Sequence, residues 1–166
     1  LFVAGATEVL VCALIERGAL AEAREALEER GLGWELDGHS EVGVRFALAR
    51  LLLAEGQFER AAEEARATGG LREGQGRPNP SWSPWRSTAA LALAHLDRRT
   101  EAAALADEEL ALAERFGAPL PRARALHARA VAEADDGQAI GLCGQGLAIL
   151  GEDSASLEAL RLRLEL

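Results

Sequence analysis

The feature that most constrains the fold is a turn pattern that occurs three times along the chain. A small residue is followed within a few positions by a segment rich in Glu, Arg and Ala, beginning at Gly18, Gly56 and Asp97. The intervals are 38 and 41 residues, which leaves room for two helices in each unit. A period near forty residues with two helices per unit is typical of α-helical repeat arrays. The sequence therefore predicts an all-α solenoid of about four antiparallel helix pairs.

The residue types agree with this prediction. Val, Ile and Thr, which favour strands, total only 13 residues, whereas unbranched Ala, Leu, Glu and Arg dominate. There is no Tyr, and aromatic residues make up 4% of the chain. A core of Ala and Leu lets helices approach closely and gives thin layers, as in a solenoid.

Helix boundaries follow from Gly, Pro and capping residues. Ser40 is placed to cap the third helix, Gly69-Gly70 to end the fourth, and Ser83-Pro84 to begin the fifth after an irregular stretch over 71–83. Asp153-Ser154 is expected to cap the last helix. We predict one domain, 1–166, with repeats at 3–30, 41–68, 84–116 and 119–150 and a truncated last helix at 154–166.

The spacing of the small residues matches the register of tetratricopeptide-type helix pairs. With Gly56 as the turn glycine, Leu52 belongs to the packing positions of the first helix and Ala61 to those of the second. The third unit has Asp97 where glycine is expected. The eighth helix carries three glycines, which indicates either close backbone packing or a weak helix: Gly141, Gly144 and Gly146.

Charge and composition limit the classes of partner. The formal net charge is −9, and the 18 basic residues are all Arg, so we expect no direct contact of this segment with nucleic acid. The apolar runs are too short for a membrane span, and we expect a cytoplasmic protein. Cys12 and Cys143 are expected to be core thiols rather than a disulfide. Because the chain has no Met, we expect a fragment or a processed form.

The middle of the chain carries a more specific pattern. Asn79-Pro-Ser-Trp-Ser-Pro-Trp-Arg-Ser87 leads into an Ala/Leu helix, followed by Asp97-Arg-Arg-Thr-Glu-Ala102, an acidic helix ending in Phe116-Gly-Ala-Pro119, and Ala125-Leu-His-Ala128. This order resembles the helical-repeat region of large ATP-binding LuxR-type transcriptional regulators, the MalT-like group, which is common in actinobacteria. The resemblance covers most of residues 5–166.

The resemblance implies a regulator in which an ATPase region precedes the repeats and a DNA-binding helix-turn-helix follows them. ATP binding and DNA binding would then belong to the parent protein, and we expect no cofactor in this segment. A P-loop cannot occur in a chain without Lys. The repeats would bind a protein or a small-molecule inducer on their concave face and support assembly, including self-association.

Four residues are the candidates for that binding role. Trp82, Trp85 and Arg86 follow one another in and after the irregular loop, and tetratricopeptide geometry would place Arg45, Arg50 and Arg86 on the concave face. We take Arg45, Trp82, Trp85 and Arg86 as the candidate partner-binding residues, with Trp34 as a similar loop residue. The alternative is that the tryptophans only fix the loop onto neighbouring helices.

Other polar residues give no pattern of catalysis or metal binding. The three histidines, His39, His95 and His127, have no ligand spacing. The acidic pairs and triplets at 28–29, 63–64 and 107–109 are expected on solvated helix faces. We therefore predict that the segment is not an enzyme. The alternative function is a stand-alone tetratricopeptide-type scaffold or adaptor for a signalling protein.

Overall fold

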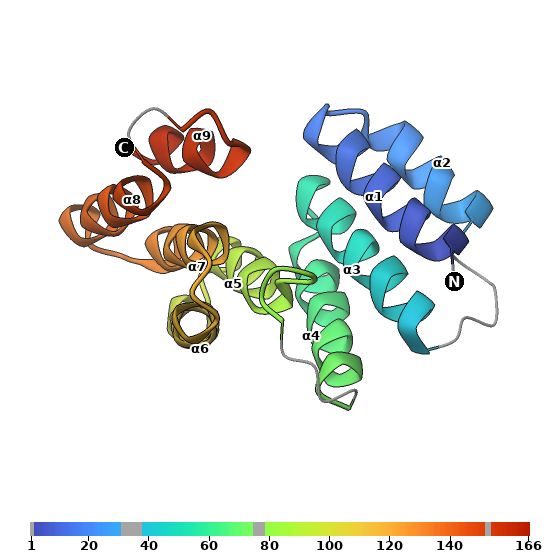
Figure 1. The fold of residues 1–166 in the computed structure, drawn as a ribbon, viewed down its shortest axis with the longest axis horizontal. Helices are drawn as coiled ribbons and strands as arrows, with labels where there is room; N and C mark the ends of the chain where they lie inside the picture. The colour runs from blue at the N-terminus through green and yellow to red at the C-terminus, as the bar shows by residue number, and fades with distance from the viewer. Residues whose placement is uncertain (1, 31–37, 75–78, 152–153) are drawn as a thin grey trace. The chain divides into compact units, whose positions relative to one another are not determined.

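The computed structural model describes residues 2–30, 38–74, 79–151 and 154–166, and the regular secondary structure within these ranges is entirely helical (Figure 1). The chain forms two compact units, Leu1–Arg77 and Pro78–Leu166. The first contains α1 (Phe2–Glu16), α2 (Leu20–Arg30), α3 (Gly38–Ala54) and α4 (Phe58–Gly74). The second contains α5 (Trp85–His95), α6 (Arg99–Phe116), α7 (Pro119–Ala132), α8 (Asp136–Leu150) and α9 (Leu157–Leu164). The all-α prediction is confirmed for these residues.

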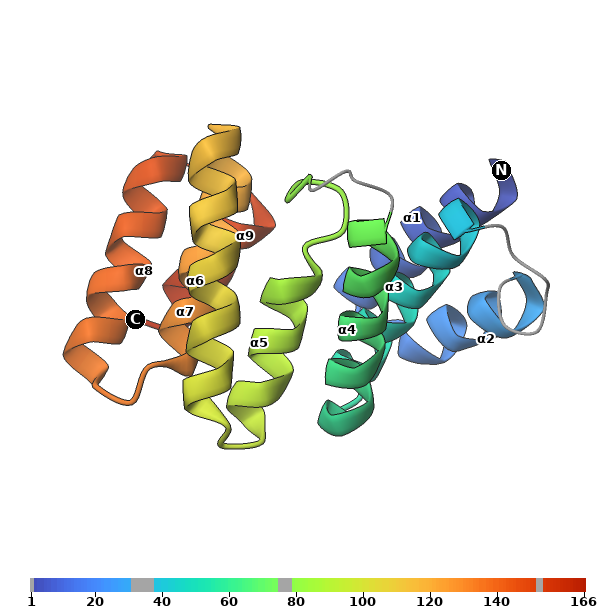
Figure 2. The ribbon, with the colours of Figure 1, turned by 90° about the horizontal axis from the view of Figure 1, so that it is seen from below.

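Each unit is organised around one helix. In the first unit α3 packs against α1, α2 and α4. In the second unit α7 packs against α5, α6, α8 and α9, and Figures 1 and 2 show it lying among these helices. The buried residues are mainly Leu, Val and Ala, as expected for closely spaced helices. The larger fully buried apolar side chains are Val11, Leu27, Val42, Val44, Leu51, Leu52, Leu93 and Leu162.

The three turns that share the sequence pattern also share one hydrogen-bond geometry. In each, the residue after the turn residue donates its N–H to the carbonyl of a buried Leu five positions earlier: Ala19 to Leu14 (2.9 Å), Gln57 to Leu52 (2.8 Å) and Arg98 to Leu93 (2.9 Å). The turn residue itself donates to the carbonyl three positions back. These are the two bonds of a Schellman motif. The following helix then places a fully buried Ala at the same position: Ala23, Ala61 and Ala102.

The Schellman motif explains why a small residue stands at each turn. Gly18 and Gly56 have φ values of 73° and 75°, a left-handed conformation that most side chains disfavour. Asp97 adopts the same conformation with φ of 59°. Asp is one of the few other residues that tolerate this region, because its short side chain can hydrogen-bond locally. The third turn therefore keeps the geometry of the other two without the glycine.

Replacing Asp97 with glycine is expected to raise the free energy of unfolding by about 0.5–1 kcal/mol, because it relieves the left-handed strain at this position. The carboxylate lies 3.1 Å from the Arg99 guanidinium, but both side chains are exposed, so losing this ion pair matters little. Urea unfolding followed by circular dichroism would measure the change. Asp97→Asn is the control, since it removes the charge and keeps a side chain. Equal stability of the two variants would contradict the strain explanation.

Helix α4 is longer than predicted. The expected end at Gly69-Gly70 is wrong, because α4 continues to Gly74 and takes up the first part of the stretch expected to be irregular. Its buried face runs through Ala61, Ala65, Thr68 and Gly69, and the Thr68 hydroxyl donates to the Glu64 carbonyl (2.9 Å). Two glycines destabilise a helix by about 2 kcal/mol in total, and the packing of this face against α3 stabilises α4 by more than that.

Three predicted caps are also wrong. Ser40 lies inside the first turn of α3, which begins at Gly38. Pro84 rather than Ser83 is the N-cap of α5. The last helix is capped by Ser156, whose hydroxyl accepts from the Ala159 N–H (3.2 Å). Ser154 lies before the helix and donates its hydroxyl to that of Ser156 (3.0 Å). Asp153 lies outside the described residues. Pro119 at the start of α7 and Gly117 at the end of α6 are as predicted.

The glycines of α8 have different environments. A Cβ atom built on Gly146 would lie 2.8 Å from Cδ1 of Leu162, a fully buried residue of α9, whereas one built on Gly144 would meet nothing within 4 Å. Close backbone packing therefore accounts for Gly146 and not for Gly144.

Gly146→Ala is expected to lower the free energy of unfolding by about 1–2 kcal/mol, because Leu162 must move in a packed core. Gly144→Ala on the same helix is the matched control, and it should raise stability by about 0.5–1 kcal/mol through helix propensity. Thermal unfolding of both variants would measure the difference. A stabilising Gly146→Ala would show that α8 and α9 do not pack as described.

Candidate functional site

The structure places the four predicted binding residues in both units. Arg45 lies on α3 of the first unit, whereas Trp82, Trp85 and Arg86 lie at the start of the second. Trp85 and Arg86 are brought together: the guanidinium carbon of Arg86 lies 4.3 Å from the centre of the Trp85 ring, within cation–π range. Trp82 lies in the turn before α5 and is 61% exposed. Trp34 lies outside the described residues.

Arg45 links two helices of the first unit. Its Nε lies 2.9 Å from Glu41 Oε1 on the same helix, and its Nη1 lies 2.9 Å from Glu64 Oε2 on α4. Arg50, also on α3, pairs with Glu16 of α1. Burial raises the pKa of the nearby Cys12 thiol, although the charge of Arg50 acts to lower it. Both arginines therefore hold carboxylates of neighbouring helices.

Arg86 has a similar role in the second unit, but one of its partners is buried. Its Nε lies 3.3 Å from Glu108 Oε2, an exposed carboxylate, and its Nη1 lies 3.8 Å from Glu109 Oε2. Glu109 is only 2% exposed, and its other oxygen, Oε1, has no hydrogen-bond partner among the residues that the structure describes. Arg86 thus connects the surface of α6 to a carboxylate in the interior of the unit.

The burial of Glu109 corrects the expectation that the acidic triplet lies on a solvated face. Asp107 and Glu108 are exposed, whereas Glu109 lies on the face of α6 that packs inward. The other buried residues of this face follow the helical spacing: Ala102, Ala106 and Ala113. This spacing is visible in the sequence and is the signal that could have identified Glu109. Burial raises the pKa of Glu109 to about 7, even though the charges of Arg86 and Arg124 act to lower it.

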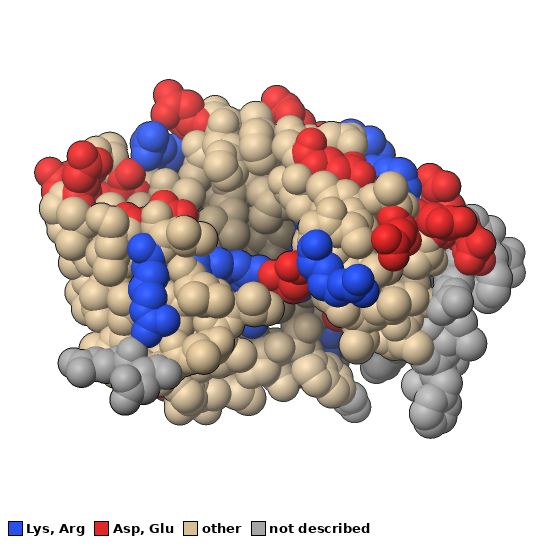
Figure 3. Space-filling view, turned by 90° about the horizontal axis from the view of Figure 1, so that it is seen from above, with Lys and Arg blue, Asp and Glu red and all other residues tan. Residues whose placement is uncertain are grey.

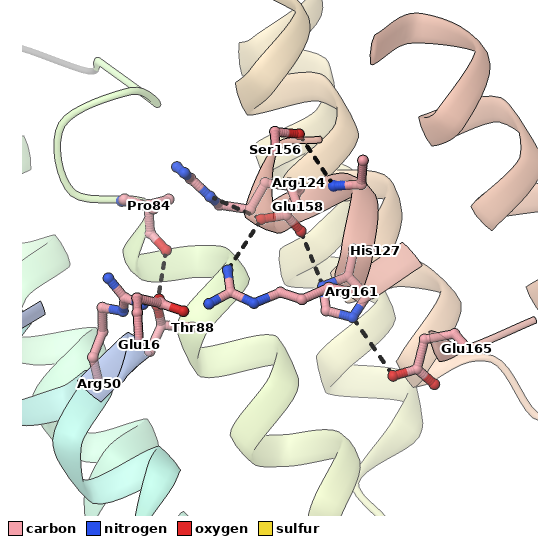
Figure 4. A network of polar contacts seen from close by, with 11 residues as sticks. Glu16, Arg50, Pro84, Thr88, Arg124, His127, Ser156, Glu158, Arg161 and Glu165 are labelled. Carbon is pink, nitrogen blue, oxygen red and sulfur yellow. Dashed lines mark hydrogen bonds and ion pairs between the residues drawn. The ribbon is translucent and has the colours of Figure 1, made fainter. Parts of the chain in front are cut away.

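A second buried carboxylate, Glu158 of α9, is surrounded by basic groups (Figure 4). Its Oε1 lies 3.1 Å from His127 Nδ1, and its Oε2 lies 3.3 Å from Arg161 Nη1 and 3.7 Å from Arg124 Nε. Burial acts to raise the pKa of Glu158, but the contacts with His127, Arg161 and Arg124 together outweigh it and lower the pKa. His127 Nε2 lies 3.6 Å from Glu165, a half-exposed carboxylate.

Arg124 joins the two buried carboxylates into one network. It lies on α7, pairs with Glu158 of α9 and acts electrostatically on Glu109 of α6. Basic and acidic groups therefore alternate through the second unit in the order Arg86, Glu109, Arg124, Glu158 and Arg161. We call these five residues the Arg–Glu network. Of its two buried carboxylates, Glu109 has its pKa raised to about 7, so its charge changes near neutral pH.

In the first unit, Glu8 is another carboxylate whose pKa is raised by burial, although the charges of Arg72 and Arg50 act to lower it. Among the described residues, His, Cys, Asp and Glu do not gather in groups of three or more that could hold a metal ion. Cys12 is half-buried and Cys143 fully buried, and both are free thiols. His95 is exposed, and the side chain of His39 lies outside the described residues. On the face drawn in Figure 3, basic side chains lie in separate groups among acidic and uncharged ones.

Of the helices that the structure describes, none has the length and apolar character that crossing a membrane requires. Comparison of the chain with protein-family models, curated proteins and solved structures finds no match.

Proposed function

We propose that the chain is a tetratricopeptide-like helical-repeat array that acts as the ligand/protein-interaction and assembly region of an ATP-dependent LuxR-type transcriptional regulator. The observation that carries the repeat assignment is the common geometry of the three turns at Gly18, Gly56 and Asp97. Each turn joins two packed helices, α1 to α2, α3 to α4 and α5 to α6. The regulator assignment rests on the resemblance over residues 79–128 and most of the surrounding chain.

The repeat register also relates two of the candidate binding residues. Arg45 and Arg86 each stand eleven positions before their turn residue, Gly56 and Asp97. Each lies on the first helix of its pair and reaches a carboxylate on the second helix. In a tetratricopeptide-like array the first helices line the concave surface, so equivalent arginines would be presented on that surface to an inducer or partner.

The regulator proposal is tested by reading the gene on both sides of this segment and expressing the encoded protein. An ATPase region upstream and a helix-turn-helix downstream, together with ATP-dependent self-association measured by light scattering and DNA binding measured by gel shift, would support it. Absence of both flanking regions would overturn it and leave the stand-alone scaffold, whose partner a pull-down would identify.

Trp82→Ala is the most suitable variant for testing the binding role. The side chain is largely exposed, so its removal leaves the core intact, whereas Arg86→Ala would also disturb buried Glu109. We expect Trp82→Ala to weaken inducer or partner binding with little change in melting temperature. Unchanged binding would remove Trp82 from the site.

A further inference from the structure

Helix α9 exposes most of its leucines. Three of its four leucines lie on one side of the helix, at steps of three and four residues, and are 52%, 48% and 85% exposed: Leu157, Leu160 and Leu164. We call these three residues the α9 face. The opposite side of α9 is buried and includes Leu162 and the charged residue Glu158. A surface helix normally turns its apolar side inward, so the outward leucines of α9 form a surface suited to contact with another protein.

The repeat register relates the α9 face to a covered face of α7. The arginines of the Arg–Glu network recur at intervals of 38 and 37 residues, on α5, α7 and α9. The second interval places Leu160 and Leu164 of α9 in register with Ala123 and His127 of α7. Ala123 is fully buried, and His127 is 7% exposed and lies 3.1 Å from Glu158 of α9. The α9 face therefore corresponds to the side of α7 that α9 itself covers, which identifies it as a surface on which a further helix can stack.

The first unit carries a matching face on α1. Among the described residues of this unit, the exposed large apolar side chains are Val9 (70%) and Leu10 (36%), both on α1. Exposed alanines lie on either side of them, and the whole set follows the helical spacing: Ala6, Val9, Leu10 and Ala13. We call these four residues the α1 face. Like the α9 face, it contains no charged residue and extends over about 10 Å of helix.

The two faces are complementary in the size of their side chains. The α9 face consists of leucines, whereas the α1 face has an alanine at each end, so large side chains of one helix can lie over small ones of the other. Their contact would also repeat a type of packing that both units contain. Helices two apart in chain order pack on each other, α1 on α3, α5 on α7 and α7 on α9. A contact between α9 and the α1 of a second copy would continue this series.

The charges beside the two faces favour pairing of unlike faces. Arg161 (35% exposed) and Arg163 reach solvent from α9, whereas Glu158 of this helix is buried; Glu165, beyond the helix, is half exposed. Helix α2 packs on α1, and its Arg24 is already paired with a carboxylate. The same helix exposes four glutamates: Glu22, Glu25, Glu28 and Glu29. Pairing of two α9 faces would bring together the arginines of both copies, whereas pairing with α1 brings them toward an acidic helix.

We infer that the chain associates head to tail, with the α9 face of one copy bound to the α1 face of the next. The inference rests on the proposed assembly role of the repeats, and it names the surfaces that carry this role. Because the two faces differ, the assembly extends as an open chain or closes into a ring. Each face has only three or four side chains, far fewer than the roughly 20–30 residues a side of a standard interface. We therefore expect a weak dissociation constant, between about 10 µM and 1 mM.

Sedimentation equilibrium of the 166-residue chain at about 10–1,000 µM tests for this association, and the average mass should rise with concentration. Val9→Glu and Leu164→Glu place a charge in the α1 face and the α9 face, and each is expected to weaken association by about tenfold or more. Both side chains are largely exposed, so the variants should keep the wild-type melting temperature. Ile140→Glu on α8 is the matched control, since Ile140 is 49% exposed and lies outside both faces. It should associate like the wild type.

A mixture of the two face variants distinguishes head-to-tail association from symmetric pairing. The Val9→Glu chain keeps its α9 face and the Leu164→Glu chain keeps its α1 face, so together they should form a 1:1 complex that grows no further. Isothermal titration calorimetry of one variant into the other would measure this complex. In symmetric pairing of two α9 faces or two α1 faces, one variant would self-associate like the wild type and the mixture would form no new complex.

Three outcomes would overturn the inference: a wild type that stays monomeric over the whole range, a face variant that associates as the wild type does, or an equal loss of association in Ile140→Glu. The first outcome would leave the two faces to a partner of different sequence. Failure of the regulator proposal shows itself in the flanking sequence instead, so the two results are distinguishable.

Discussion

Replacing Glu109 with glutamine is expected to raise the free energy of unfolding of the second unit by about 2–3 kcal/mol at pH 8.5. Burial raises the pKa of this carboxyl from 4.5 to about 7, so the folded unit binds the proton more tightly than the unfolded chain. Stabilisation by the bound proton is complete below pH 4.5 and is lost as the pH rises through 7. The difference between the folded and unfolded pKa values corresponds to about 3 kcal/mol of stability lost when the carboxyl is ionised. Glutamine would keep the side chain neutral at every pH.

Urea unfolding followed by circular dichroism at pH 5 and pH 8.5 would measure this effect. The gain from Glu109→Gln should be much smaller at pH 5, where the wild-type carboxyl is already protonated. Glu108→Gln is the matched control, because it removes the same charge from the adjacent, exposed residue that also contacts Arg86. It should change stability by less than about 0.5 kcal/mol. Equal effects of the two variants would show that Glu109 is not buried.

Replacing Glu158 with glutamine is expected to have the opposite effect, a loss of about 3 kcal/mol at pH 7. Removing one partner of a buried ion pair leaves the other charges uncompensated, and Glu158 faces His127, Arg124 and Arg161. Its pKa is lowered in the folded unit. The stabilisation by its negative charge is therefore present above pH 4.5 and is lost as the pH falls through the folded value.

Thermal and urea unfolding at pH 7 and in more acidic solution would test this prediction. The difference between wild type and Glu158→Gln should shrink as the pH falls. Glu165→Gln is the control, since Glu165 also lies near His127 but is half exposed. It should cost less than about 1 kcal/mol. Wild-type stability of Glu158→Gln at pH 7 would contradict the described contacts.

The two glutamates show why a residue type alone does not determine its behaviour. Both are equally buried, but Glu158 has three basic groups within 3.1–3.7 Å, whereas the basic group paired with Glu109 lies at 3.8 Å. Burial therefore dominates at Glu109 and charge at Glu158. Their opposite dependence on pH follows from these distances.

The candidate site was only partly predictable. The sequence singled out Trp85 and Arg86, and the structure brings them into contact. It did not single out Arg124, His127 or Glu158, because these residues come from helices that are far apart in the sequence. The period of 38 and 37 residues between the arginines is the signal that could have revealed the network.

The sequence by itself determined the helical class and the three repeated turns, because helix propensity and a left-handed turn residue act within a few positions of the chain. Even there, packing against α3 carried α4 past the two glycines that were expected to end it. Only the tertiary structure decided which charged residues are buried and which basic groups surround them. Burial and ionisation depend on which helix faces meet, and this is set by contacts between segments distant in the chain.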